Sequence, residues 1–209
     1  MSVGSIIVSL CAGFFVFYAV SNLSKEKKKA LIEEMVTQLI HFIIFIWLGK
    51  IVLNFSAFIK SPLAILAYPS DSGAFYMAIL FISTVLFYKS KRSQTNVSLL
   101  IENFIPVFLV AAFLYEFIDL VWNDNNYSFG NLGLFTFLLL LYLSIRDNVP
   151  RLVTVVMLLG WTGGSFVLSL IQPFYTVYGF IMAPWFIGLF FIVNLPIIIY
   201  TRFRQDKIH

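Results

Sequence analysis

The stretch Ser98–Trp122 reads SLLIENFIPVFLVAAFLYEFIDLVW and decides the class of the protein. It is almost wholly apolar, and a helix needs about 20 such residues to cross a bilayer. The whole chain has the same character, because 60% of its 209 residues are hydrophobic, 18% are aromatic and only 11% are charged. A soluble domain averages about 25% charged residues, so this chain has too little polar surface to fold as a globule in water. The composition excludes a soluble enzyme, a nucleic-acid module and a disordered chain.

Working outward from this stretch, we predict an all-α membrane protein with seven transmembrane helices in one bundle, a single domain over residues 1–209. The other six predicted spans are about Val3–Asn22, Met35–Ser56, Gly73–Tyr88, Phe129–Ile145, a stretch that starts after Pro150-Arg151 and ends near Ile171, and Val177–Thr201. The charged segment Ser24–Glu34 is predicted to connect the first two spans. Pro184 and Pro196 are expected to kink the last span.

The basic residues predict how the chain is oriented. Twelve of the 14 Lys and Arg residues lie between spans one and two, three and four, five and six, or in the tail. They are Lys25, Lys27, Lys28, Lys29, Lys89, Lys91, Arg92, Arg146, Arg151, Arg202, Arg204 and Lys207. Because cytoplasmic loops are enriched in Lys and Arg, we predict a multi-pass membrane protein with its N-terminus outside and its C-terminus in the cytoplasm.

Residues 57–72, before the third span, contain an apolar piece, Pro62–Tyr68, that is too short to cross the membrane. This segment is expected to lie in the outer interface or to dip into the bundle as a re-entrant element. Irregular backbone at membrane depth is tolerated only against protein or water.

Five polar side chains inside the predicted spans are candidates for a ligand-binding site: His41, Lys50, Asn54, Glu116 and Asp119. An ionisable side chain near the centre of a span costs about 2.5–3.5 kcal/mol, so it needs a partner or a wet cavity. Lys50 and Glu116 each lie six residues before the outer end of their span, at matching depth. We predict that they pair, with Asn54 and Asp119 one turn nearer the surface on the same helical faces.

Simpler readings of these residues remain open. Lys50 could extend to the outer headgroups and Asp119 could reach water. His41 is more easily explained as a packing residue than as a catalyst. One cysteine and two histidines provide no disulfide within the chain and no metal cluster, and no familiar catalytic or nucleotide-binding motif occurs. We therefore expect no metal, no cofactor and no nucleic-acid partner, and the sequence identifies no catalytic residue.

The run Tyr88–Arg92 (YKSKR) followed by Val97–Pro106 (VSLLIENFIP) is similar to a basic loop and a K-L-A-D-x-x-A-P segment of the prolipoprotein diacylglyceryl transferases. The layout also resembles that family: seven spans, the N-terminus outside, the segment Ser24–Glu34, Lys50 where the family has an arginine, and Ser61–Ala74 in place of the loop leading into its H-G-G-L-I-G motif. The resemblance covers nearly the whole chain and implies a bacterial inner-membrane protein.

The family's functional motifs are not retained. Pro69–Gly73 (PSDSG) has no histidine where the family has His-Gly-Gly. In the family's G-R-x-x-N-F-x-N motif, Glu116 stands in the place of the arginine and Asp119 in that of an asparagine. Gly164 stands where the family has a later arginine, and the extracellular head domain is absent. The resemblance therefore implies a relative that does not catalyse the transfer, or one of altered specificity.

The first functional expectation is a membrane protein that binds a lipid, a lipoprotein precursor or a membrane-protein partner. Lys50, Glu116 and Asp119 together carry one net negative charge, which favours a cationic or neutral ligand. Two alternatives stay open. One is a diverged, active diacylglyceryl transferase that uses phosphatidylglycerol, and the other is a small transporter or channel with a wet path from Glu116 inward past His41.

Overall fold

The computed structural model describes residues 3–63, 65, 71–92, 96–146 and 150–205, and the chain is mostly helical, at 84%. Its elements are, in chain order, α1 (Val3–Val20), α2 (Lys25–Leu53), α3 (Phe55–Lys60), α5 (Ser72–Lys91), α6 (Val97–Trp122), α7 (Ser128–Ile145), α8 (Pro150–Ile171), β1 (Thr176–Val177), β2 (Phe180–Ile181) and α9 (Pro184–Gln205). The chain forms two compact units. The first comprises Met1–Ile32 and Ser98–His209, and the second is Glu33–Val97. The expectation of one domain over the whole chain stays a prediction.

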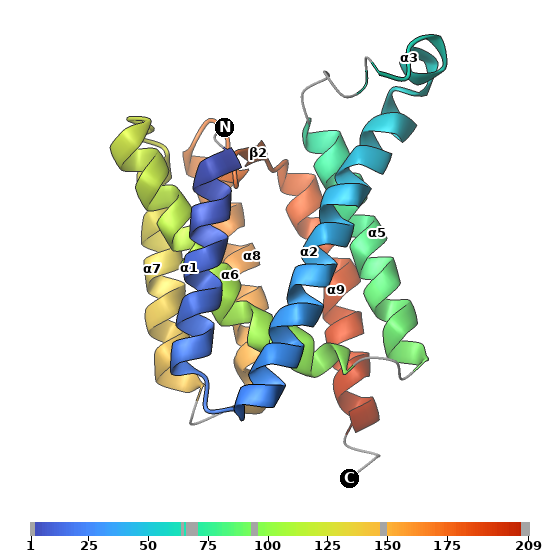
Figure 1. The fold of residues 1–209 in the computed structure, drawn as a ribbon. Coiled ribbons are helices and arrows are strands. Elements are labelled where there is room, and N and C mark those ends of the chain that lie inside the picture. Colours follow the sequence, from blue (N-terminus) through green and yellow to red (C-terminus); the bar gives the residue numbers. More distant parts are fainter. Residues whose placement is uncertain (1–2, 64, 66–70, 93–95, 147–149, 206–209) are drawn as a thin grey trace. The chain divides into compact units, whose positions relative to one another are not determined.

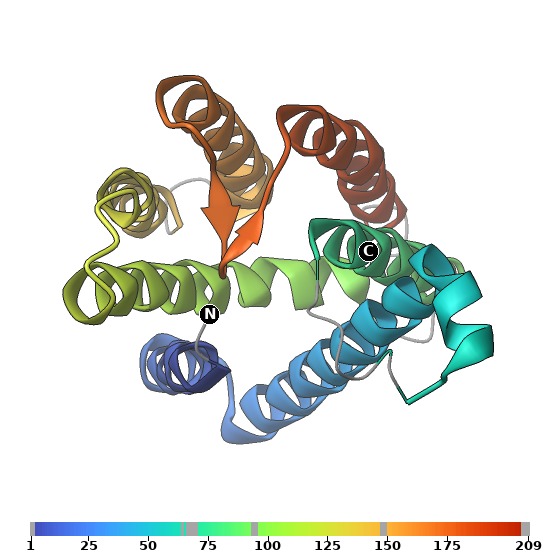
Figure 2. The ribbon, with the colours of Figure 1, turned by 90° about the horizontal axis from the view of Figure 1, so that it is seen from above.

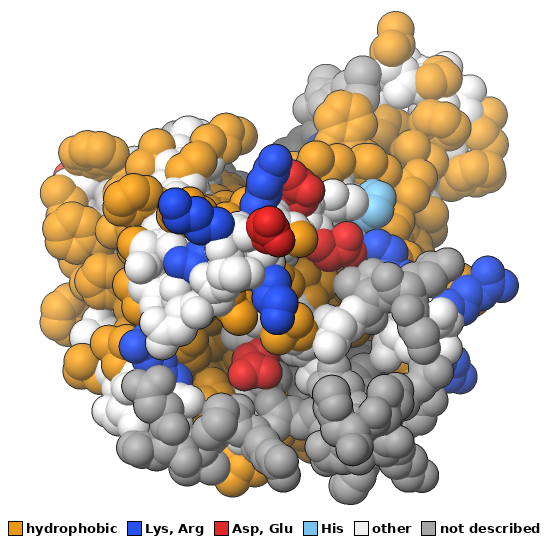
Figure 3. Space-filling model, turned by 60° about the horizontal axis from the view of Figure 1, so that its bottom comes forward, with side chains coloured by type: hydrophobic (Ala, Val, Ile, Leu, Met, Phe, Trp, Pro, Cys, Tyr) orange, Lys and Arg blue, Asp and Glu red, His pale blue; other side chains and the backbone are white. Residues whose placement is uncertain are grey.

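Among the residues that the structure describes, six helices are long and apolar enough to cross a membrane: α1, α2, α5, α6, α7 and Leu152–Ile171 of α8. Their flanks carry large exposed hydrophobic side chains, among them Phe15, Phe137 and Leu140. Charged side chains stand at helix ends: α2 begins with Lys25 and Glu26, and α5 ends with Lys89 and Lys91. Lys, Arg, Asp and Glu side chains are visible on the face shown in Figure 3. In water these flanks would form large apolar patches, so the structure is compatible with a multi-pass membrane protein.

The first unit is built around α6 (Figure 1). Seen from above, α1 lies on one side of α6, and α7 and α8 lie on the other (Figure 2). The buried residues of α1 are Ser9, Gly13 and Phe17, which recur at every fourth position and share one face. A Cβ atom at Gly13 would lie 2.5 Å from the carbonyl oxygen of Val107 and 3.3 Å from the Cβ atom of Ala111. The small residues therefore let the backbones of α1 and α6 approach closely, as in many membrane helix pairs.

Aromatic side chains join the opposite side of α6 to the C-terminal helices. The ring of Phe108 makes edge contacts with Phe135 of α7 and Trp161 of α8, with centroids 6.0 and 6.1 Å apart. Trp161 in turn meets Phe190 of α9 at 5.3 Å. Such edge-to-face pairs are the preferred geometry for aromatic rings. Phe108 and Trp161 thus connect four helices of the first unit.

In the second unit, α2 and α5 also meet at a small residue. A Cβ atom at Gly49 would lie 2.9 Å from the carbonyl oxygen and 3.1 Å from the Cα atom of Ala74. The rings of Phe42 and Phe75 add an edge contact at 5.5 Å. Asp71 precedes α5, and its Oδ1 accepts a hydrogen bond of 2.8 Å from the N–H of Ala74. This is an N-cap, which satisfies one of the free N–H groups at the start of the helix.

The prediction that the last span begins at about Val177 is wrong. β1 and β2 form an antiparallel hairpin at this point, and α9 begins only at Pro184. Pro184 therefore does not kink a helix as predicted. It is the first helical residue, where the missing N–H leaves no hydrogen bond unmade. Pro196, the other predicted kink position, does lie inside α9.

The hairpin turns tightly and its tip reaches α6 (Figure 2). Val177 pairs with Phe180, and the two residues between them, Tyr178 and Gly179, have φ angles of 50° and 80°. Two consecutive positive φ angles are typical of a type I′ turn, for which glycine is well suited. The ring of Tyr178 lies 5.3 Å from that of Tyr115 on α6. The apolar run after α8 thus folds back onto the unit instead of starting a span.

Two other connecting segments differ from expectation or fall partly outside the structure. Ser24–Glu34, predicted as a connection, is almost entirely helical, because α2 already begins at Lys25. Lys, Glu and Ala are strong helix formers, so the helix starts before its apolar part does. Within residues 57–72, α3 ends at Lys60, and residues 64 and 66–70 lie outside the described residues. Whether this segment is interfacial or re-entrant stays a prediction.

Candidate functional site

Glu116 is the central residue of the candidate site. It lies on α6 six residues before the last residue, Trp122, which is about 9 Å below the helix end at about 1.5 Å per residue. Its side chain is buried, with 1% exposed, and Oε2 accepts no hydrogen bond from the described residues. A buried polar atom without a partner costs about 1–3 kcal/mol, and more when it is charged. A carboxyl group kept in an apolar span at this cost is a functional-site hypothesis by default.

Asn131, on α7, also belongs to the candidate site around Glu116. Its side chain is 2% exposed, and Nδ2 donates a hydrogen bond of 3.3 Å to the carbonyl oxygen of Thr176 in β1. Its Oδ1 atom has no partner among the described residues. The side chains of Asn131 and Ser128 lie close enough to the Glu116 carboxyl group to interact with it. Helices α6 and α7 and the hairpin therefore contribute to one buried polar cluster.

The hairpin and α8 supply hydroxyl and indole groups. The hydroxyl of Tyr175 accepts a hydrogen bond of 2.8 Å from Ser165 Oγ. The hydroxyl of Tyr178 and Nε1 of Trp161 are buried without partners among the described residues. Burial raises the pKa of both tyrosines, and the nearby Glu116 charge raises it further, so both hydroxyls stay protonated and can donate. Together with these groups, Glu116 and Asn131 form what we call the Glu116 cluster: Glu116, Asn131, Trp161, Tyr175 and Tyr178.

Asp119, one turn closer to the end of α6, has its carboxylate occupied by neighbouring side chains. It accepts hydrogen bonds from Asn123 Nδ2 at 2.7 Å, Asn125 Nδ2 at 2.6 Å and Ser128 Oγ at 2.9 Å. These bonds span the turn that joins α6 to α7. The geometry therefore gives Asp119 a role in organising this turn, and its predicted role in ligand binding stays a prediction.

Lys50 and Asn54 lie in the second unit. The Lys50 side chain is 8% exposed and helps to line a small cavity of about 70 Å³, together with Trp47 and Phe58. Asn54 follows one turn later, and its Nδ2 donates a hydrogen bond of 3.1 Å to the Lys50 carbonyl oxygen. The predicted pair of Lys50 and Glu116 would join the two units, and it stays a prediction.

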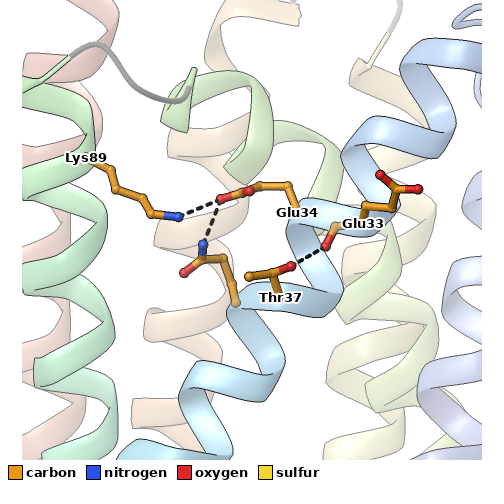
Figure 4. Close-up of polar contacts among 5 residues, drawn as sticks. Glu33, Glu34, Thr37 and Lys89 are labelled. Carbon is orange, nitrogen blue, oxygen red and sulfur yellow. Dashed lines mark hydrogen bonds and ion pairs between the residues drawn. The ribbon is translucent and has the colours of Figure 1, made fainter.

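His41 and a charged pair lie elsewhere along α2. The ring of His41 stacks on that of Phe45 with centroids 6.3 Å apart, and its buried Nδ1 has no hydrogen-bond partner among the described residues. Nearer the start of α2, Glu34 Oε1 accepts hydrogen bonds from Lys89 Nζ at 3.0 Å and from Gln38 Nε2 at 2.7 Å (Figure 4). The pair of Glu34 and Lys89 therefore ties α2 to α5 at this end of the second unit.

We expect this ion pair to contribute little to stability, because both side chains are partly exposed, at 27% for Glu34 and 23% for Lys89. In a double-mutant cycle with Glu34→Gln and Lys89→Met, measured by thermal unfolding in detergent, the coupling energy should be about 0.5–1 kcal/mol. A coupling energy of about 3 kcal/mol or more would instead indicate a fully buried pair and contradict the observed exposure.

Sequence reasoning identified Glu116 but missed the residues around it. The asparagine at position 131 was a usable signal, because a buried amide in an apolar helix needs a partner. Trp161, Tyr175 and Tyr178 gave no such signal, since aromatic residues are common throughout this chain. Among the described residues, no group of three or more His, Cys, Asp or Glu side chains could hold a metal ion.

Comparisons with models of protein families, with curated proteins and with solved structures find no match. The resemblance to the diacylglyceryl transferases rests on sequence layout and stays a prediction.

Proposed function

We propose that this chain is a bacterial plasma-membrane protein with seven spans, its N-terminus outside and its C-terminus in the cytoplasm, that binds a membrane ligand at the Glu116 cluster without catalysing a reaction. In this proposal α9 is the seventh span. The ligand is a lipid, a lipoprotein precursor or a membrane-protein partner.

The observation that carries the proposal is the buried Glu116 carboxyl group, whose Oε2 lacks a hydrogen-bond donor among the described residues. Three further buried polar atoms without such partners belong to the same cluster: Asn131 Oδ1, Trp161 Nε1 and Tyr178 Oη. Native proteins leave few buried polar groups unsatisfied, and several in one cluster call for an explanation. A bound ligand that completes these hydrogen bonds is the explanation that the geometry favours.

The charge of the site supports a binding role over the family's transfer reaction. That reaction would require an anionic phosphatidylglycerol headgroup to be held where Glu116 and Asp119 place two carboxylates. Like charges disfavour such a complex by several kcal/mol in a low-dielectric environment, on the order of magnitude given by Coulomb's law. A cationic or neutral ligand meets no such barrier.

Native mass spectrometry of the protein purified in mild detergent tests this function. We expect wild-type protein to retain a bound lipid or peptide, and Glu116→Gln to lower its occupancy about tenfold, because a hydrogen bond to a charged group contributes about 1.5–3 kcal/mol. Asp124→Asn is the matched control, since it removes one carboxylate from an exposed position with a positive φ angle that asparagine tolerates.

Equal occupancy in the wild-type protein and Glu116→Gln would contradict the proposal. The transferase alternative has its own assay, with phosphatidylglycerol and a lipobox peptide as substrates. Transfer at a rate comparable to that of a genuine family member would replace the binding proposal. Ion flux through reconstituted liposomes that depends on Glu116 would replace it with the transporter alternative.

A further inference from the structure

The atoms of the Glu116 cluster that lack hydrogen-bond partners indicate which kind of hydrogen-bonding group a ligand would supply. Glu116 Oε2 comes from α6 and Asn131 Oδ1 from α7, and neither atom receives a hydrogen bond from the described residues. An amide oxygen only accepts hydrogen bonds, and so does an ionised carboxylate oxygen. Glu116 Oε2 and Asn131 Oδ1 therefore require a donor, and a donor beside an ionised Glu116 is most favourable when it carries positive charge.

The Tyr115 and Tyr178 side chains of the first unit lie close enough to Glu116 to interact with it electrostatically. The rings of Tyr115 and Tyr178 have centroids 5.3 Å apart, and Phe108 lies 6.2 Å from Tyr178. The faces of aromatic rings attract cations through the ring quadrupole. Rings together with a carboxylate thus form a site for an organic cation, and the same groups disfavour an anionic group at the position that the cation occupies.

Hydrogen bonding narrows the kind of cation. A quaternary ammonium group has no N–H and would leave both Glu116 Oε2 and Asn131 Oδ1 without donors, at the full cost of two unsatisfied buried atoms. A primary ammonium group has three N–H donors, enough for both oxygens with one to spare. The two unsatisfied oxygens, Glu116 Oε2 and Asn131 Oδ1, therefore fit a primary ammonium group, whereas Trp161 Nε1 is itself a donor that such a group does not satisfy.

The hairpin provides the cover of this site. Tyr178 stands at its tip, with its hydroxyl buried in the cluster, whereas the adjacent Gly179 and Ile181 are exposed. The hairpin is short, with two residue pairs between β1 and β2. It is attached to α7 through the hydrogen bond from Asn131 to Thr176 and to α8 through that from Ser165 to Tyr175.

We propose that Glu116 and Asn131 bind the primary ammonium group of a ligand, and that the Tyr178 side chain covers this group from the hairpin. The inference rests on the proposed binding function and names the chemistry of its ligand. Two sources carry this chemistry: the headgroup of an aminophospholipid such as phosphatidylethanolamine, and a free alkylamine.

The test uses the delipidated full chain in mild detergent, offered equal amounts of phosphatidylethanolamine, phosphatidylcholine and phosphatidylglycerol and analysed by native mass spectrometry. We expect phosphatidylethanolamine to be bound about tenfold more than either competitor, because only its headgroup donates charged hydrogen bonds to both oxygens. Glu116→Gln and Asn131→Leu should each abolish this preference, and the control Asp124→Asn should keep it. In a second arm, excess ethanolamine displaces the lipid when the ammonium group alone is recognised, and fails to displace it when the acyl chains are also required.

The outcomes separate this inference from the function on which it rests. Equal binding of phosphatidylcholine, or a preference for phosphatidylglycerol, overturns the ammonium assignment even when binding still depends on Glu116, and the proposed function then stands. Binding of all three lipids that is unaffected by Glu116→Gln overturns both. Because the preference is measured first on the wild-type protein, it is decided even where a variant fails to fold.

Discussion

Replacing Gly13 with leucine is expected to separate α1 from α6 and to destabilise the first unit by about 3 kcal/mol, near the upper end of the cost of overpacking a core. The reason is the backbone itself. A Cβ atom at position 13 would already lie 2.5 Å from the Val107 carbonyl oxygen, which belongs to the helix and cannot rotate away. Thermal unfolding in detergent, followed by circular dichroism, measures this loss.

Gly133→Leu is the matched control for this change. Gly133 lies on α7, and no described atom comes within 4 Å of a Cβ atom placed there. The same substitution at this site should alter stability by less than about 1 kcal/mol, and in the stabilising direction, since leucine is the better helix former. Similar losses for Gly13→Leu and Gly133→Leu would show that the close contact of α1 with α6 does not limit stability.

Asp119→Ala is the second substitution with a large expected effect. It removes the acceptor of three hydrogen bonds, from Asn123, Asn125 and Ser128, and at about 1 kcal/mol each the expected destabilisation is about 3 kcal/mol. Asp119→Asn keeps one carbonyl oxygen as an acceptor and should lose less. Unfolding in detergent provides the measurement for both variants.

Asp119→Ala also distinguishes the roles of Asp119 and Glu116, which the sequence analysis assigned to one ligand-binding site. Protein with Asp119→Ala that remains folded should still bind the ligand, whereas Glu116→Gln should lose the ligand and keep most of its stability. Loss of ligand from folded Asp119→Ala protein, with stability unchanged, would return Asp119 to the binding site and contradict its structural role in the turn between α6 and α7.

The sequence predicted the helices well where an apolar run ends at a cluster of polar residues. The span predicted at Ser98–Trp122 appears as α6, Val97–Trp122, because Asn123 and the residues after it cannot be buried without partners. Likewise Phe129–Ile145 appears as α7, Ser128–Ile145. Hydropathy predicts these helix ends because polar side chains and free backbone groups cannot lie in an apolar environment without hydrogen-bond partners.

Hydropathy alone could not reveal the hairpin. The residues from Val177 to Pro184 are apolar enough to be read as the start of a span, yet the backbone turns at Tyr178 and Gly179. A tyrosine followed by glycine between two short apolar runs was the available signal, because a two-residue turn of this type needs positive φ angles at both positions. Pro184 was the second signal, as proline is favoured at the first position of a helix.

The candidate site was predictable only at its centre. A lone glutamate in an apolar helix is conspicuous because of its cost, so Glu116 was found from the sequence. Its neighbours Asn131, Trp161 and Tyr178 come from three later elements, and which of the many aromatic residues would join them depends on how α7, α8 and the hairpin pack. Packing of this kind is a property of the folded chain that no local pattern encodes.

The two units differ in when their parts are synthesised. The second is continuous in the chain, whereas the first consists of Met1–Ile32 and residues that begin only at Ser98. When α1 emerges, α6 has not been synthesised, so Gly13 and the buried hydroxyl of Ser9 lack the helix they pack against until the whole second unit has been translated. Translation that stops before Val97 leaves α1 without the helix it packs against, and such fragments are expected to be substrates for membrane proteolysis.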